Sequence, residues 1–346
     1  MENADPNIRF YRRFVIIILA YEALGCLLGG ALLVMAPDGH LMEMPVRIMH
    51  GVFPDFTVPG FILLLLGVVN AAAFWAVLQK ANRSLWMALF ALGGLLGWFW
   101  MEIAILQQLH WLHAMWGLPV LLAFAAALQL YPWTDREKQI VLLICGIAAS
   151  LLYADVVVIV PALSETYNSN TQTISELSAI GAPTRFVWIT LTLPYTLLMI
   201  AFSWGVIRSA AKSRPLKITG GLLLLYALTG LFWPLAPMHQ RQVLAAGGGS
   251  FTDQAHLALG ALTEMLYLLA LLFAAYGLDR GFRIYSALTL CGILVFGVLT
   301  FSAARRLAAE QPTPNLGLWE RINIGIFLLW VCVLAFKLIN LKPEKK

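Results

Sequence analysis

Carboxylates, histidines and arginines gather in three polar segments that separate long apolar runs of this 346-residue chain. The first segment, 172–185, reads QTISELSAIGAPTR and carries a carboxylate and an arginine beside several hydroxyls. The other two, 239–256 and 311–321, add histidines, arginines and further carboxylates. Side chains of these types can ligate a metal, hold an anionic group or tie loops together through ion pairs.

The TDQAH segment (252–256) opens an apolar run, which makes Asp253 first of all a helix N-cap. Asp253 and His256 are three residues apart and share a helix face, as in carboxylate–histidine metal sites of helix bundles. That face continues to Glu264, about 12 Å deeper at about 1.5 Å per residue. A carboxylate at membrane depth is costly unless it is paired or faces a wet cavity. We therefore expect Glu264, and Asp155 in an earlier apolar run, to face a cavity or a basic partner rather than lipid.

A metal centre is one chemistry that this set would support. Zinc takes about four nitrogen, oxygen or sulfur ligands and leaves a position open for water in catalytic sites. His239, Asp253 and His256 would supply three ligands, and Asp155 or Glu176 the fourth. The chain has no His-x-x-x-His pair to strengthen that prediction.

Two further interpretations use the same residues. Arg185, Arg241 and Arg321 could bind a phosphate or carboxylate head group through bidentate hydrogen bonds. The charged residues could instead form a structural cluster of salt bridges that holds the loops together. We expect one outward-facing pocket, and the residues expected to line it are Asp155, Glu176, Arg185, His239, Arg241, Asp253, His256, Glu264, Glu320 and Arg321.

The elements that must position these residues are membrane-spanning helices. The chain is 60% hydrophobic and only 12% charged, with a mean hydropathy of +0.80, which indicates an all-α integral membrane protein. The net charge of +5 is spread over short loops and does not indicate nucleic-acid binding. Ten apolar runs are long enough to span a membrane, and they lie at about 14–36, 56–78, 84–106, 109–131, 140–163, 187–209, 217–237, 255–278, 282–304 and 317–341.

Lysine and arginine fall mainly in alternate loops, which places both termini in the cytoplasm of a plasma-membrane protein. The three polar segments then face outward. A composition shift near 131–136 predicts two modules, a four-helix bundle over 1–133 and a six-helix bundle over 134–346. No internal repeat is visible, so an inverted-repeat transporter is not supported.

In the first module, two carboxylates lie within apolar runs. We expect Glu22 and Glu102 to pair across the bundle with a protonated group or a hydroxyl. The spacings Gly25/Gly29 and Gly93/Gly97 match a motif for close helix packing in membranes. The four cysteines are isolated in apolar runs and have no metal-binding spacing.

The second module resembles a known family. The motifs SELSAIGAPTR, PMHQRQVLAAGGG, D-x-x-H and PTPNLGLWERINIGIFLLW are similar to those of the bacterial domain-of-unknown-function family 998, a six-helix membrane module, over about 134–346. The first 130 residues resemble unnamed four-helix bacterial membrane modules through YEALG and a D-F-x-x-P-G turn. Looser similarity to Frag1-like and ceramidase-like membrane proteins implies work on lipids, although the ceramidase-like His-x-x-x-His pair is missing.

These observations keep three function classes open. The leading hypothesis is a binding protein whose outward pocket holds an amphipathic, anionic, lipid-like ligand. The first alternative is a metal-dependent membrane lipid hydrolase with zinc at His239, Asp253 and His256. The second is a structural or accessory membrane subunit. The expected partners are membrane lipid and an amphipathic small molecule, and not nucleic acid.

Overall fold

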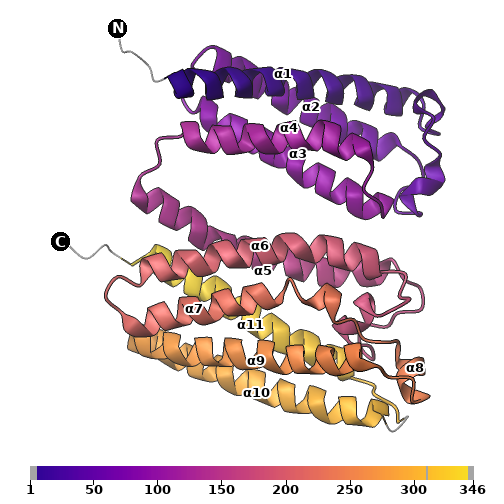
Figure 1. Ribbon diagram of the computed structural model, residues 1–346, viewed down its shortest axis with the longest axis vertical. Coiled ribbons are helices and arrows are strands. Elements are labelled where there is room, and N and C mark those ends of the chain that lie inside the picture. The colour runs from indigo at the N-terminus through magenta and orange to yellow at the C-terminus, as the bar shows by residue number, and fades with distance from the viewer. Residues whose placement is uncertain (1–5, 309–310, 342–346) are drawn as a thin grey trace. The chain divides into compact units, whose positions relative to one another are not determined.

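A computed structural model of the chain describes residues 6–308 and 311–341. Its regular structure is helical, and no strand occurs among the residues described. In the described part of the chain, ten helical segments are long and apolar enough to cross a membrane, which confirms the predicted all-α membrane fold. The chain divides into two compact units, unit 1 (Met1–Trp133) and unit 2 (Thr134–Lys346). Figure 1 shows the helices of each unit.

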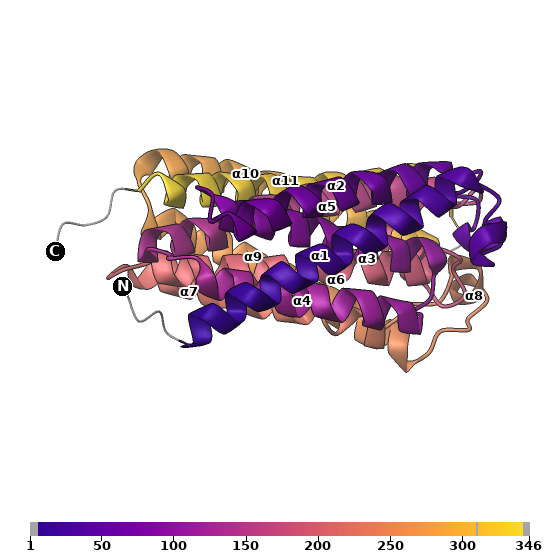
Figure 2. The ribbon, with the colours of Figure 1, turned by 90° about the horizontal axis from the view of Figure 1, so that it is seen from above.

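Unit 1 is a four-helix bundle with two short 3-10 turns in its first connection. Within the bundle α1 packs on α2 and α4, and α3 packs on α2 and α4. Figure 2 shows α1 running obliquely over its neighbours. The elements are α1 (Pro6–Met35), η1 (His40–Met42), η2 (Val46–Met49), α2 (Thr57–Leu78), α3 (Ser84–Leu106) and α4 (Trp111–Leu130).

The glycines that bring α1 and α2 together are not the expected ones. A Cβ at Gly25 would lie 2.5 Å from Trp116 Cζ3 on α4, so close packing is confirmed there, whereas one at Gly29 or Gly97 would meet no atom within 4 Å. Instead, a Cβ at Gly30 would lie 2.8 Å from the Gly60 carbonyl oxygen, and one at Gly67 would lie 2.8 Å from Leu27 Cγ. The two backbones approach this closely because these positions have no side chain.

Unit 2 contains six long helices and several short turns. The α5 helix begins with a capping box in which Thr134 and Glu137 satisfy free backbone N–H groups. Large side chains such as Trp330, Phe202 and Phe327 fill the core. The elements are α5 (Asp135–Ala162), η3 (Ile174–Ser178), α6 (Arg185–Ser209), α7 (Arg214–Thr229), η4 (Trp233–Leu235), α8 (Arg241–Ala245), α9 (Phe251–Gly277), α10 (Arg280–Ala308) and α11 (Leu316–Ile339).

The seventh span, Arg214–Leu235, has the expected length but is not one continuous helix. A helix was predicted over 217–237, but α7 ends at Thr229 and the chain continues through η4. Pro234 explains the early end, because proline donates no backbone hydrogen bond and disfavours helical geometry in the residue before it. The three polar segments lie where α5 ends, α6, α9 and α11 begin, and α7 gives way to η4. The expectation that this end faces outward stays a prediction.

Candidate functional site

The loop of residues 167–178, here called the docking loop, is the centre of the polar site in unit 2. Arg321 of α11 holds its backbone: Nη1 donates to the carbonyl oxygens of Ser169 and Gln172 at 2.7 and 3.0 Å. Its Nη2 donates to the Tyr167 hydroxyl at 2.6 Å. Burial raises the pKa of Tyr167 to about 12, and that hydroxyl donates in turn to Thr173 O at 2.7 Å. The guanidinium therefore fixes the loop against α11.

A glycine lets the docking loop approach α11 this closely. A Cβ at Gly317 would lie 2.1 Å from Gln172 O and 2.5 Å from Ser169 O, closer than any side chain tolerates. The Gly317 N–H donates to Asn170 O at 2.9 Å. Loop and helix thus join through backbone atoms on both sides.

Glu176 and Arg241 form the best-connected ion pair of the site. Arg241 donates to both carboxylate oxygens at 2.7 Å, and its Nη2 also donates to Thr171 O at 2.9 Å. The Thr173 N–H and the Gln172 side chain donate to the same carboxylate at 2.9 and 3.1 Å. The Glu176 side chain is only 4% exposed, so these bonds replace nearly all of its contact with water.

The hydrogen bonds decide the charge state of this pair. Burial alone raises the pKa of the Glu176 carboxyl, but the bonds from Arg241, Thr173 and Gln172 outweigh it and hold the pKa below its ordinary value. The bond to Glu176 likewise raises the pKa of Arg241. Both groups are therefore charged at neutral pH.

His239 and Asp253 form a second pair at the start of α9. His239 Nδ1 lies 2.8 Å from Asp253 Oδ2, and the His239 N–H donates to Oδ1 at 2.7 Å. Ser250, not Asp253, is the N-cap: the two residues form a capping box, with the Ser250 N–H donating to Asp253 at 2.7 Å. The expectation that Asp253 is the N-cap of α9 is therefore wrong: the N-cap is Ser250, three residues earlier, and Asp253 is the N3 residue.

His256 uses both ring nitrogens within the protein. Nδ1 lies 2.8 Å from the Ala236 carbonyl oxygen, which can only accept, so Nδ1 carries the proton. Nε2 then accepts from the Ser175 hydroxyl at 2.9 Å. Trp233 packs edge-on against the ring at 4.8 Å. Sequence reasoning did not identify Ser175, because a lone serine in a polar loop carries no distinguishing signal.

Arg185 and Glu320 complete the attachment of the docking loop. Arg185 donates through Nη1 to Ser178 O and through Nη2 to Pro234 O at 3.2 Å. Glu320 Oε2 accepts from the Ile174 N–H at 2.6 Å. Eight of the expected site residues lie at one end of unit 2. Each belongs to, or contacts, the docking loop or the segment 234–239. They are Glu176, Arg185, His239, Arg241, Asp253, His256, Glu320 and Arg321.

Two expected site residues do not join this network. Asp155 is exposed on α5 and makes no hydrogen bond or ion pair within the described part of the chain. The expectation that Asp155 shares a buried set is therefore wrong. Glu264 lies deeper on α9, where it contacts the Tyr267 hydroxyl, which donates to Asn323 Oδ1 at 3.0 Å. Glu264 thus belongs to a separate polar group between α9 and α11.

The expected zinc ligands are not arranged around a common point. His239 bonds Asp253, whereas the nitrogens of His256 are occupied by Ala236 and Ser175. Within residues 6–308 and 311–341, no three His, Cys, Asp or Glu side chains are grouped so that they could hold a metal ion. This geometry gives a zinc centre no support.

Three polar atoms beneath the docking loop have no partner among the described residues. They are Arg321 Nε, which is fully buried, the Tyr153 hydroxyl and the second Glu320 oxygen. Tyr153 lies within electrostatic range of both Glu320 and Arg321. Tyr153 and Glu320 are both half-buried. Tyr153 was missed because tyrosines in apolar runs are usually interfacial anchors.

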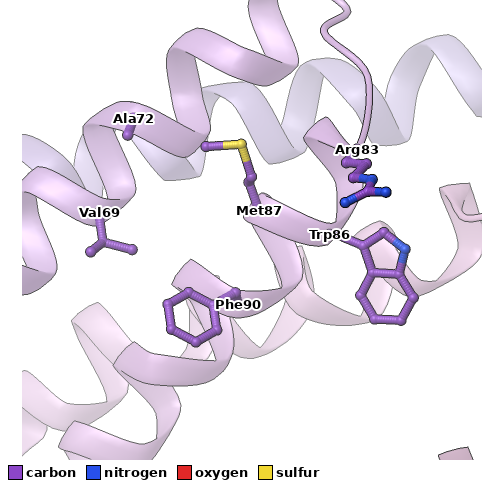
Figure 3. Close-up of a pocket in the computed structure, with 6 residues that line it drawn as sticks. All are labelled: Val69, Ala72, Arg83, Trp86, Met87 and Phe90. Carbon is purple, nitrogen blue, oxygen red and sulfur yellow. The ribbon is translucent and has the colours of Figure 1, made fainter.

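Two hollows on the described part of the chain lie away from this network. One, of about 420 Å³, is in unit 1 between α2 and α3 and is almost wholly apolar. Figure 3 shows its lining, with the Phe90 and Trp86 rings on α3 and Arg83 at one edge. The other is a shallow apolar patch on α10. Neither contains a residue of the expected site.

The comparisons with known proteins identify a family for unit 2. The sequence profile of the family described as "Protein of unknown function (DUF998)" matches residues 147–337, which is more than half of the chain. The chain therefore belongs to this family, as the motifs of the second module predicted. Neither the curated proteins nor the solved structures contain a match to it.

Proposed function

We propose that unit 2 is a membrane-embedded binding module that holds the polar head of an amphipathic, anionic ligand beneath the docking loop. The observation that carries this proposal is Arg321 Nε, a buried charged donor with no partner in the described protein. An unsatisfied buried donor costs about 1–3 kcal/mol, and more for a charged group. A ligand oxygen would supply the missing acceptor.

The neighbouring groups narrow the chemistry of that ligand. Arg321 Nε and the Tyr153 hydroxyl both donate, which favours phosphate or carboxylate oxygens. The unpartnered Glu320 oxygen accepts, which favours a hydroxyl on the same head group. The apolar helices around the site suit acyl chains. A lipid-like molecule with an anionic, hydroxylated head would match all three features.

The other arginines and the histidine of the expected pocket hold the docking loop rather than a ligand. Arg241 donates to Glu176, and Arg185 donates to carbonyl oxygens. His256 accepts from Ser175. This part of the expected pocket therefore acts as a lid that fixes the loop over the interior. A purely structural role for the whole chain would leave Arg321 Nε without a hydrogen-bond acceptor.

Lipid retained through purification tests this function. The full-length protein would be extracted in mild detergent, and its bound lipids identified by mass spectrometry. Arg321→Lys keeps the charge but removes Nε together with Nη1 and Nη2, which hold the docking loop, so hydrogen exchange of residues 167–178 would be measured beside the lipid content. The exposed Arg208 supplies the control Arg208→Lys. A charged hydrogen bond contributes about 1.5–3 kcal/mol, so Arg321→Lys should retain about tenfold less anionic lipid than wild type or control. Equal lipid content in all three proteins would contradict the proposal.

A second candidate function rests on the Ser175–His256 pair. A serine hydroxyl that donates to a histidine, itself oriented by a second hydrogen bond, is the arrangement of an activated nucleophile. The orienting group here is the Ala236 carbonyl oxygen rather than a carboxylate. This candidate would be a metal-independent hydrolase of acyl esters at the membrane surface.

A fluorophosphonate probe separates the two candidates. An activated Ser175 would react covalently with the probe, and Ser175→Ala or His256→Ala would abolish the reaction. Ser178→Ala removes a neighbouring hydroxyl of the same turn and serves as the control. If the folded wild-type protein does not react, Ser175 is a structural partner of His256.

A further inference from the structure

Unit 1 contains buried polar atoms that the described protein leaves without partners. They include both carboxylate oxygens of Glu22 on α1 and the amide oxygen of Asn70 on α2. Glu22 is 1% exposed and Asn70 is 0% exposed. The pairing of Glu22 expected from the sequence is therefore wrong. Such atoms are rare in folded proteins, and at membrane depth no water can satisfy them.

The register of α1 against α2 brings these two residues together. A Cβ at Gly30 would touch the Leu64 backbone, and one at Gly67 would touch Leu27. Moving from Gly30 to Leu27 on α1 thus moves the neighbouring position on α2 from Leu64 to Gly67, as expected for antiparallel helices. The next turn places Glu22 within one helical turn of Asn70. Three oxygen acceptors, two from Glu22 and one from Asn70, therefore lie in one buried region of the interface.

Small side chains surround this region. Ala23 and Ala73 are 6% and 0% exposed and fall in the same turn of the interface. Asn70 donates its Nδ2 to Leu66 O at 2.8 Å, which anchors the amide and leaves its oxygen free.

No positive side chain of the described part of unit 1 pairs with Glu22. The α2 helix has no titratable residue. The groups that could act on Glu22 from its own and neighbouring helices are Tyr21 and Cys26 on α1, Glu102 on α3 and His113 on α4. Glu22 and Glu102 both lie within electrostatic range of Cys26. A positive counter-charge must therefore come from outside the protein.

We propose that Glu22 and Asn70 form an intramembrane site for a small monovalent cation, either a proton or Na⁺. Oxygen atoms of carboxylates and amides are the ligands of hard cations. A single carboxylate balances one positive charge. Buried carboxylates inside membrane bundles mark ion or proton sites for the same energetic reason. This site lies in unit 1 and does not depend on the function proposed for unit 2.

The thermal stability of the full-length protein in detergent tests this site. The unfolding midpoint would be followed by tryptophan fluorescence in NaCl or choline chloride at constant ionic strength and at several pH values. The variants are Glu22→Gln and, as a control, Glu43→Gln, which changes an exposed glutamate of the same unit. A cation that binds only the folded state raises the midpoint by roughly 2 °C or more at about ten times its Kd.

Two results would support the site and identify its cation. For Na⁺, the midpoint rises with NaCl in wild type and Glu43→Gln but not in Glu22→Gln. For a proton, NaCl has no effect, and wild type and Glu43→Gln lose stability as pH rises, because the folded state holds a proton that the unfolded chain has released. In that case the unfolding midpoint of Glu22→Gln falls less than that of wild type as pH rises. Identical responses of wild type and Glu22→Gln to both salt and pH would overturn the proposal.

Labelling of the wild-type protein covers the case in which Glu22→Gln does not fold. A hydrophobic carbodiimide modifies protonated carboxyl groups, and mass spectrometry would identify Glu22 as its target. We expect modification that falls with added Na⁺ or with rising pH. In Asn70→Leu, which removes one acceptor, the protection by cation should weaken. If Glu22 is not modified at any pH, or if its modification is independent of both cations, the site does not exist.

Discussion

The two carboxylate oxygens of Glu176 each accept a hydrogen bond of 2.7 Å from the guanidinium of Arg241, across 65 residues of sequence. The pair joins the docking loop to the start of α8. It lies among the contacts that fix the loop over the interior of unit 2, so the loop's stability depends on a small number of buried charges.

Removing one member of this pair should be strongly destabilising. Glu176→Ala leaves the Arg241 charge half-buried and unpaired, and loss of one partner of a buried pair costs about 3–5 kcal/mol. Glu165→Ala, which removes an exposed carboxylate at the start of the same connection, should change stability by less than about 0.5 kcal/mol. Denaturant unfolding of the purified protein measures both. Equal effects of the two variants would show that the ion pair does not stabilise the fold.

Acid should destabilise the protein through the same carboxylate. The folded-state pKa of Glu176 lies below its ordinary value of 4.5, because hydrogen bonds outweigh burial. A carboxylate with a lowered pKa contributes stability that is present above the unfolded pKa and is lost as pH falls through the folded pKa. Below about pH 4.5, the wild-type unfolding midpoint should fall more steeply than that of Glu176→Gln. Parallel curves for the two proteins would exclude this linkage.

Asp155→Ala should be mild, contrary to the expectation from sequence. That expectation placed Asp155 in one outward-facing pocket with nine other polar and charged residues. The side chain is exposed and has no partner among the described residues, so its removal should change the free energy of unfolding by less than about 0.5 kcal/mol. The assay is the one used for Glu176→Ala. A loss above about 2 kcal/mol would indicate a partner that the structure does not show.

Gly317→Ala should release the docking loop from α11. The added Cβ would lie 2.1 Å from Gln172 O and 2.5 Å from Ser169 O, and these are backbone atoms that cannot rotate away. Such overpacking costs about 1–3 kcal/mol or more. On the same helix, a Cβ at Gly325 meets nothing within 4 Å, so Gly325→Ala is the matched control and should be neutral or slightly stabilising. Hydrogen exchange of residues 167–178 should rise in Gly317→Ala only.

The fold was predictable because apolar runs of membrane-spanning length leave little choice of structure. The exception is the seventh span, in which α7 ends at Thr229 and η4, which contains Pro234, completes the span. The helix face of Asp155 was not predictable, because an apolar run in a membrane helix has no polar face to orient it. The glycine pairs were predictable only in part: Gly25 packs closely on Trp116, but Gly29 and Gly97 do not, and the close approach at Gly30 and Gly67 depends on how α1 crosses α2.

The site was only partly readable from the sequence. Charged residues of the polar segments were visible because they interrupt apolar runs. Their pairing was not, since Arg241 reaches Glu176 and His256 reaches Ser175 only through tertiary contacts. Tyr153 was missed because nothing in its local sequence distinguishes an interior hydroxyl from an interfacial anchor.

The most direct test of the binding function is a cryo-EM map of the full-length protein in lipid nanodiscs containing anionic lipid. We predict non-protein density beneath the docking loop, with a head-group oxygen about 3 Å from Arg321 Nε and further contacts to Tyr153 and Glu320. The density should disappear in Arg321→Lys and persist in Arg208→Lys. A map in which Arg321 Nε contacts another protein atom, with no density between Tyr153 and Glu320, would contradict the account.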